Sequence, residues 1–394
     1  MIPEIDLADP EVVRDPATVY GRAREQGPVA RLVAPGFGVM WAMTRHSAAR
    51  AMLSDPRFAM GPNTFLDLPI PDPCRKYLRS LGTLEGAEHT RLRRLVSPAF
   101  TARRMHGLRT RIEAIVERIL DELPGHAVDG VVDLQEHFAR PIPADVICDL
   151  VGIPEADRAD WRRYGAAIQA GHGQEFIEAI PRVMAGAEAA VAHHRAEPGE
   201  NLISDLIRAQ EADGDRLDDT ELVTFVWQLA LAGQAPVTTQ LANAVEVLLR
   251  HPDQLALLRA EPERMAWAVE ELIRWAGPQL LTFPRFATED VEFEGVRIRA
   301  GEAVTAAIAA VNRDPRVYTD PERLDLTRSP GEAAHLGFAH GPHFCLGASL
   351  ARVEIEVALT ALLRRHPALA TAGDGATRVP DPGTWRLATL PVTL

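Results

Sequence analysis

The sequence predicts a mainly α-helical protein with small β-sheets, and two patterns support this class. Three segments carry apolar residues at intervals of three and four, the spacing of amphipathic helices. These segments are 108–123, 183–196 and 263–275. Strand-like segments are short, and they lie at 30–44, 291–299, 303–309 and 386–394. No repeat, low-complexity tract or Gly/Ser-rich linker divides the chain, so we expect a single domain over residues 1–394.

Composition excludes several classes of protein. The 394 residues are 46% hydrophobic and 25% charged, which is the balance of a globular chain and not of a disordered one. With 55 acidic and 42 basic side chains the net charge is −13, which disfavours binding to nucleic acid or to an anionic membrane. The N-terminus lacks the basic and apolar regions of a signal peptide, and no run reaches the ~18 to 20 apolar residues of a membrane span. We therefore expect a cytoplasmic protein.

One long helix contains an unusual centre. Asp218 and Glu221, three residues apart, form a capping-box pattern at its start, and His251-Pro252 ends it. The middle reads AGQAP, where Pro236 lacks the backbone donor that would pair with the carbonyl of Ala232. A proline inside a helix costs ~3 kcal/mol or more. We therefore expect a kink or a groove at this point.

Of the three cysteines, Cys74, Cys148 and Cys345, the last has the most informative surroundings. Three cysteines are too few for a disulfide framework. Cys345 lies where a Gly/Pro loop enters an apolar-periodic helix that stops at His366-Pro367. The unpaired amides and positive end of a helix favour thiolate over thiol, which prepares the sulfur to bind a metal.

The loop around this cysteine has a specific pattern. It contains, in order, Phe338, Gly341, His343, Cys345 and Gly347. This pattern resembles the haem-binding loop of the cytochrome P450 family, whose cysteine is the axial iron ligand. The resemblance implies the cytochrome P450 fold, haem b as cofactor and Cys345 as the metal ligand. Ala339 stands where the family usually has Gly or Ser, a change that we expect to stiffen the loop without preventing haem binding.

Further motifs follow in the family's order, from about Pro16 to the C-terminus. Glu271 and Arg274, in EELIR, resemble the family's structural Glu-x-x-Arg pair, and they share one helix face. The segment 312–328 resembles the loop that precedes the cysteine. Carboxylates removed from water need charged or hydrogen-bonding partners. By resemblance, the partners of the haem propionates are His89, Arg93, Arg285 and His343.

The long helix departs from the family. The family usually carries an acid and a threonine there, which deliver protons during oxygen activation, and this chain has Ala235 and Pro236 instead. Thr238 and Thr239 are rotated by ~200 to 300° from the required face. We expect the oxygen-activation groove at Gln234, Ala235 and Pro236, with a hydroxyl or amide of the substrate, helped by ordered water, completing the proton path.

The resemblance implies a haem-thiolate monooxygenase. We expect it to use dioxygen and electrons from a ferredoxin and its reductase to oxidise a small secondary metabolite, by hydroxylation or by oxidative coupling or rearrangement. We expect the haem domain to occupy the whole chain, and we therefore expect a separate protein to supply the electrons. We also expect a monomer. Basic residues that could steer an acidic ferredoxin are Arg91, Arg94, Arg103, Arg104 and Arg352.

The substrate pocket is expected, by resemblance, to be bounded by segments 60–84, 168–176, 229–236, 279–283 and 385–389. Its lining should be mostly apolar. The candidate lining residues are Phe65, Leu231, Ala232, Leu280, Phe283 and Leu387. The candidate polar contacts are Gln234, Thr282, Thr389 and His172.

Two other functions stay open. A haem sensor or carrier without turnover would suit the missing acid-threonine pair. A zinc protein would use His335, His340, His343 and Cys345, although these lack the paired spacing of structural zinc sites. The sequence contains no P-loop, no G-x-S-x-G elbow and no G-x-G-x-x-G turn, so hydrolase and nucleotide-binding functions have no support.

Overall fold

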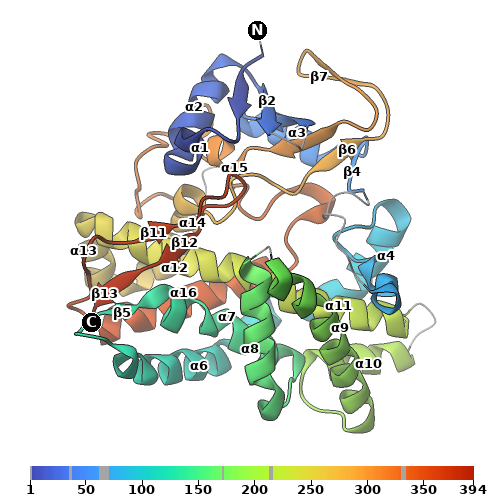
Figure 1. The fold of residues 1–394 in the computed structure, drawn as a ribbon, viewed down its shortest axis with the longest axis vertical. Helices are drawn as coiled ribbons and strands as arrows, with labels where there is room; N and C mark the ends of the chain where they lie inside the picture. The colour runs from blue at the N-terminus through green and yellow to red at the C-terminus, as the bar shows by residue number, and fades with distance from the viewer. Residues whose placement is uncertain (1, 35–37, 62–70, 171–172, 213–215, 330–333) are drawn as a thin grey trace. The chain divides into compact units, whose positions relative to one another are not determined.

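The computed structural model describes residues 2–34, 38–61, 71–170, 173–212, 216–329 and 334–394. The chain forms two compact units, each built from several segments (Figure 1). Unit one comprises Met1–Thr64, Thr239–Cys345 and Ala370–Leu390, and unit two comprises Phe65–Thr238, Leu346–Leu369 and Pro391–Leu394. Helices predominate and the sheets are small, which confirms the predicted fold class. The single domain over residues 1–394 stays a prediction.

Unit one contains a mixed six-stranded sheet. Its strands in spatial order are β1 (Glu4–Asp6), β2 (Val29–Ala34), β3 (Gly38–Met43), β9 (Ala303–Ala306), β6 (Arg285–Ala287) and β4 (Phe58–Ala59). Side chains alternate between its faces, as the pleat requires. Leu32 and Ala42 join the core with Tyr20 of α2 (Pro16–Gln26), whereas Met43 joins the core with Leu53 of α3 (His46–Ser54). The two faces are therefore both covered.

Other elements of unit one follow local rules. They are α1 (Pro10–Arg14), α13 (Pro252–Ala260), η5 (Pro262–Arg264), α14 (Met265–Ala276), α15 (Ile308–Val311), η6 (Gly341–His343), β7 (Val291–Phe293), β8 (Val296–Ile298), β10 (Ala370–Thr371), β11 (Thr377–Arg378) and β12 (Leu387–Thr389). The predicted helix at 263–275 is confirmed as η5 and α14. The strand predicted at 303–309 is too long, because the chain turns into α15 at Ile308. The strand at 291–299 is a hairpin, whose turn places Glu294 and Gly295 at φ 49° and 76°.

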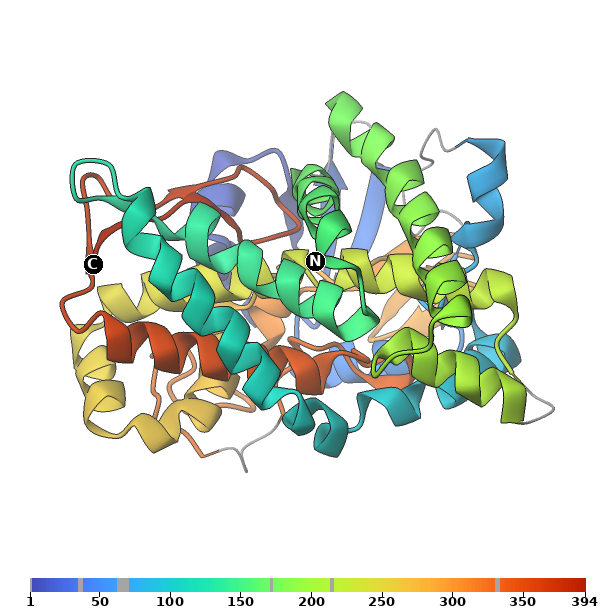
Figure 2. The same ribbon diagram turned by 90° about the horizontal axis from the view of Figure 1, so that it is seen from below.

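Unit two is mainly helical. Its elements are η1 (Asp72–Leu78), α4 (Gly86–Val96), η2 (Ser97–Phe100), α5 (Ala102–Gly107), α6 (Arg109–Glu122), η3 (Leu123–His126), β5 (Val132–Asp133), η4 (Gln135–Ala139), α7 (Pro141–Val151), α8 (Glu155–Ala170), α9 (Gly173–Ala196), α10 (Leu202–Ala212), α11 (Asp219–Ala232), α16 (Ala348–Arg365) and β13 (Pro391–Thr393). Figure 2 shows α16 lying along α6. The predicted helix at 108–123 is confirmed as α6, whereas the one predicted from residue 183 begins earlier, at Gly173. Across the described ranges, no helix has the length and apolar character needed to cross a membrane.

The long helix predicted from Asp218 is divided into α11 and α12 (Ala235–Arg250). Its capping box is confirmed: Glu221 N–H donates to the Asp218 carboxylate at 2.7 Å, and Asp218 N–H donates to that of Glu221 at 2.9 Å. The expected break is also confirmed. Pro236 is the second residue of α12, where a missing N–H costs no intrahelical hydrogen bond. The proline therefore starts a helix and does not interrupt one.

Candidate functional site

The cysteine loop belongs to unit one, and a backbone hydrogen bond holds its fold. Cys345 N–H donates to the carbonyl of Phe338 at 2.9 Å, and the rings of Phe338 and Phe344 meet edge-on with centroids 6.3 Å apart. Ala339 and Gly341 both adopt positive φ, 60° and 74°. The side chain of Cys345 is exposed. Cys345 is thus an exposed residue in a loop of defined backbone fold, three residues before the start of α16.

The other two cysteines have different surroundings. Cys148 is buried on α7, where desolvation raises the pKa of its thiol to about 12. Cys74 is half-buried in η1, and desolvation raises its pKa as well. Neither environment favours a thiolate, which is the form of cysteine that binds metal. Cys345 is therefore the best placed of the three for ligation.

Arg285 and the cysteine loop meet at the C-terminal end of α3. Arg285 is buried on β6 and its Nη1 donates to the carbonyl of Leu53 at 2.8 Å. A Cβ at Gly341 would lie only 2.6 Å from the same carbonyl oxygen, so only glycine lets the loop approach this closely. His343 ends the short η6 helix two residues later. Within unit one, the structure therefore gathers two of the four predicted propionate contacts beside the cysteine loop.

The other two predicted propionate contacts lie on one helix of unit two. His89 and Arg93 are four residues apart on α4, so they share a helix face. The side chain of His89 is buried and that of Arg93 is half-buried. A buried imidazole next to a guanidinium on the same face is a suitable surface for a carboxylate.

Glu271 and Arg274 on α14 form a fully buried ion pair. Arg274 donates to both carboxylate oxygens of Glu271, at 2.7 and 2.8 Å, in a bidentate arrangement. Arg328 adds a second cation, with its Nε 3.2 Å from Glu271 Oε2. The remaining guanidinium N–H groups of Arg274 donate to the backbone carbonyls of Asn312, Pro321 and Arg323.

This network ties α14 to the segment that leads to the cysteine loop. Arg274 uses every donor of its guanidinium, and Asp325 N–H donates to Glu271 at 3.0 Å. The sequence singled out Glu271 and Arg274 but missed Arg328 as their third member. Arg328 is the last residue of the 312–328 segment that the sequence singled out. Its ion pair with Glu271 forms only because that segment folds back onto α14.

The predicted oxygen-activation groove lies at the break between α11 and α12. Gln234 is buried, whereas Ala235 and Pro236 are half-buried. None of these three side chains can ionise. The break between the two helices therefore presents one carboxamide and two apolar side chains, and the oxygen-activation role expected for these residues stays a prediction.

The described residues among the predicted pocket lining are divided between the two units. In unit one, Leu280 is buried and its N–H donates to Gly383 at 3.0 Å, which brings segment 279–283 beside the C-terminal turn that carries Leu387. Phe283 is exposed, with 58% of its surface accessible. In unit two, Leu231 is half-buried and Ala232 is exposed on α11. Phe65 and His172 lie outside the described residues.

The residues present fit a haem better than a zinc ion. Within unit one, Cys345 is an exposed sulfur donor and Arg285 is a buried cation suited to a carboxylate, and a haem requires both kinds of group. His335, by contrast, is already engaged: its Nε2 lies 3.3 Å from the Glu270 carboxylate and its Nδ1 accepts from Gly337 N–H. No group of three or more His, Cys, Asp or Glu side chains suited to a metal occurs among the described residues. The zinc alternative therefore receives no support from the side-chain geometry.

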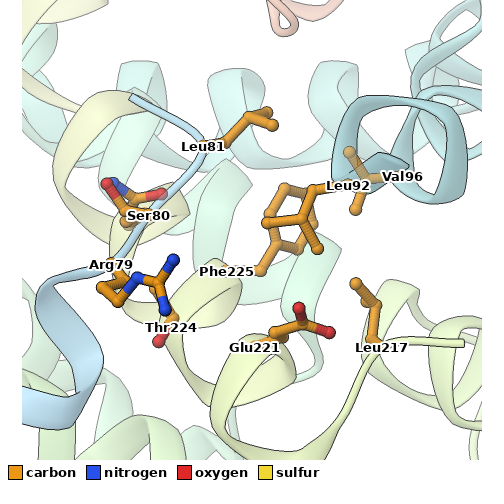
Figure 3. A pocket seen from close by; sticks show the side chains of 10 residues that line it. Arg79, Ser80, Leu81, Leu92, Val96, Leu217, Glu221, Thr224 and Phe225 are labelled. Carbon is orange, nitrogen blue, oxygen red and sulfur yellow. The ribbon is translucent and has the colours of Figure 1, made fainter. Parts of the chain in front are cut away.

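Unit two also contains a small pocket (Figure 3). It is lined by Arg79, Ser80, Leu81, Leu92, Val96, Leu217, Glu221, Thr224, Phe225 and Gln228. Two of its charged groups are paired with neighbours: Arg79 binds Glu88 at 2.7 Å, and Glu221 binds Arg91 at 2.7 Å. Three of its lining residues, Arg79, Ser80 and Leu81, belong to segment 60–84, which we expected to bound the substrate pocket.

Comparisons with known proteins show what the chain as a whole is similar to. A family model described as Cytochrome P450 matches residues 169–375. The chain is 40% identical to the mycinamicin IV hydroxylase/epoxidase of Micromonospora griseorubida over 89% of this chain and 88% of that protein. It is 38% identical to the 6-deoxyerythronolide B hydroxylase of Saccharopolyspora erythraea, over 93% and 91%. The solved structure of the polyketide-synthase cytochrome P450 PksS of Bacillus subtilis 168 matches with a TM-score of 0.88 and 32% identity, covering 98% of both chains.

Proposed function

The chain belongs to the cytochrome P450 family, and from this premise we propose that it is a haem-thiolate monooxygenase that oxidises a small secondary metabolite. It is an oxidoreductase, as its named relatives are. The proposed cofactor is haem b, which supplies the electron-transfer and oxygen chemistry when it is bound. The relative named as the polyketide biosynthesis cytochrome P450 PksS supports a substrate of the polyketide class.

The observation that carries the proposal is the exposed thiol of Cys345, held in its loop by the Phe338 carbonyl. Cys345 would hold the haem iron through its thiolate, and Phe338 and Gly347 would contribute to the cofactor site. His89 and Arg93 from α4, and Arg285 and His343 from unit one, would bind the propionates. Buried Arg285 is the best placed of these, because β6 and the Leu53 carbonyl fix the direction of its guanidinium.

The proton path is proposed to depend on the substrate. Ala235 and Pro236 cannot hold or move a proton, and the nearest polar side chain at the helix break is Gln234. Ala232 ends α11, and carbonyls in the last turn of a helix have no intrahelical partner, so they can hold an ordered water. A hydroxyl or amide of the substrate would complete the path. Hydroxylation, oxidative coupling and rearrangement are all compatible with this arrangement.

The proposed electron donor is a ferredoxin with its reductase. Five arginines were candidates for its docking site, and two of them already hold carboxylates. Arg91 pairs with Glu221 at 2.7 Å, and Arg104 pairs with Asp205. These internal pairs reduce the charge that Arg91 and Arg104 can offer to a partner, so we expect charge reversal at Arg103 to slow reduction at low salt more than reversal at Arg91.

The test of the thiolate assignment is a carbon monoxide spectrum of the reduced protein. The parent, Cys74→Ser and Cys148→Ser should all show the red-shifted Soret band of a thiolate-ligated haem, and Cys345→His should lose it. A band that persists in Cys345→His would refute the assignment. Turnover of a polyketide substrate with ferredoxin and its reductase would then separate a monooxygenase from a haem carrier.

The substrate-assisted proton path has its own test, which compares product formed with NAD(P)H consumed. The native substrate should be well coupled, and an analogue that lacks its polar group should divert electrons to peroxide. The double variant Ala235→Glu, Pro236→Thr should partly restore coupling for the analogue. Equal, efficient coupling of substrate and analogue in the parent would contradict substrate assistance.

A further inference from the structure

Gln234 is a buried side chain without a protein partner. It lies in the short turn between α11 and α12, and only 2% of its surface is exposed. A carboxamide can donate two hydrogen bonds and accept two. Within the part of the chain that the structure describes, no hydrogen bond joins this carboxamide to another residue. Buried polar groups are normally paired, so this amide is suited to a partner that the chain itself does not supply.

A glycine on the facing helix determines where this amide lies. A Cβ added to Gly165 of α8 would be 2.0 Å from Gln234 Oε1, 3.0 Å from Cδ and 3.2 Å from Nε2. No side chain larger than hydrogen can therefore stand at position 165 while Gln234 keeps this orientation. Since Oε1 is the nearest atom and Nε2 the farthest, the amide rests its oxygen side against α8 and directs its N–H donors away from it.

The neighbouring residues limit what can bind there. Ala235 and Pro236 follow directly, and none of the four residues Gly165, Gln234, Ala235 and Pro236 carries a charge. A charged group bound among them would lose its hydration without a counter-ion, which is costly. A neutral acceptor oxygen would match the free N–H donors at no such cost. The site therefore suits a carbonyl, ether or hydroxyl oxygen.

We propose that Gly165 is a positioning residue for Gln234, and that Gln234 Nε2 donates a hydrogen bond to a neutral oxygen of the substrate. The inference rests on the proposed function and deepens it. It identifies the substrate's polar group as an uncharged oxygen held at the helix break, next to the place where the acid-threonine pair is missing. Gly165 acts only through Gln234, so the two residues should be coupled.

The first test uses a matched ligand pair, cyclododecanone and cyclododecane, which differ by one acceptor oxygen. Their dissociation constants for the haem-loaded protein are measured from the change in its absorption spectrum. Gln234→Leu should lower the preference for the ketone about five- to ten-fold, the value of one hydrogen bond. Gly165→Ala should lower it similarly, and the double variant should show no further loss. An unchanged preference in both single variants would overturn the proposal.

The second test needs no haem and measures thermal unfolding midpoints in a double-mutant cycle. Gly165→Ala should lower the midpoint in the parent, because its methyl collides with the amide. In the Gln234→Ala background the same change should raise the midpoint, since alanine favours a helix over glycine. Gly186→Ala on α9, whose Cβ would lie 3.2 Å from Trp161, is the control glycine and should act alike in both backgrounds. Additive effects of the two changes would overturn the coupling.

The outcomes also separate this inference from the proposed function. If the parent lacks the thiolate carbon monoxide band, the proposed function fails. If the band is normal but the ketone preference does not depend on Gln234, only the present inference fails. If Gly165→Ala does not fold, the Gln234→Ala background should restore folding, and failure to do so would refute the positioning role.

Discussion

Arg274→Lys is the sharpest test of the buried network in unit one. The side chains of Arg274 and Glu271 are only 2% and 3% exposed, and the guanidinium makes five hydrogen bonds, two to the carboxylate and three to backbone carbonyls. Lysine keeps the charge but has three donors and no fork, so at least two acceptors lose their partners. A buried acceptor left unpaired costs ~1–3 kcal/mol. We therefore expect the free energy of unfolding to fall by ~3 kcal/mol.

The assay is urea unfolding followed by circular dichroism. With a slope of ~3 kcal/mol/M, the midpoint should fall by about 1 M. Arg250→Lys is the matched control, because Arg250 also pairs with a helix glutamate, Glu246, but its side chain is 70% exposed. Glu246 is buried and keeps Arg378 as a second partner at 3.2 Å, so the solvent-exposed Arg250 guanidinium should contribute only ~0.3–0.5 kcal/mol. Equal midpoints for the two variants would refute the argument that burial and full donor use make Arg274 irreplaceable.

Three further variants test other parts of the fold by the same urea assay. Ala339→Gly should raise stability by ~0.5–1 kcal/mol, because φ of 60° is strained for alanine, and no change would show that the loop relieves this strain elsewhere. Asp145→Asn should lower stability by ~2 kcal/mol, since the buried Asp145 binds Arg118 of α6 and Arg162 of α8; a loss below ~0.5 kcal/mol would contradict a shared role of this carboxylate. Glu354 is completely buried on α16, and desolvation raises its pKa well above the ordinary value. The folded protein then keeps a proton that the unfolded chain releases, so the contribution to stability is full below the ordinary pKa and is lost as pH rises towards the folded pKa. Glu354→Gln should flatten this decline as pH rises above the ordinary carboxyl pKa, and an unchanged pH profile would exclude Glu354 as its source.

Some of the fold and the site could be predicted from the sequence because the physical causes are local. The period of the apolar residues predicted α6 and α14, and the capping box at Asp218 predicted where α11 starts. A loop with glycines before a helix predicted the setting of Cys345. These features depend on residues that are a few positions apart in the sequence. Local sequence therefore determines them without contacts from distant segments.

Tertiary structure decided the features that depend on distant segments. The sequence AGQAP could not show that Pro236 lies at the start of a second helix. That outcome depends on the conformation of residues 233–234, which separate α11 from α12. Arg328 was missed as a partner of Glu271, since the 312–328 segment must fold back onto α14 before the two charges meet. Gln234 was recognised as a polar residue, but only packing against Gly165, 69 positions earlier in the 394-residue chain, shows how its amide is held. Local sequence determines which groups are available, whereas long-range packing determines their partners and orientation.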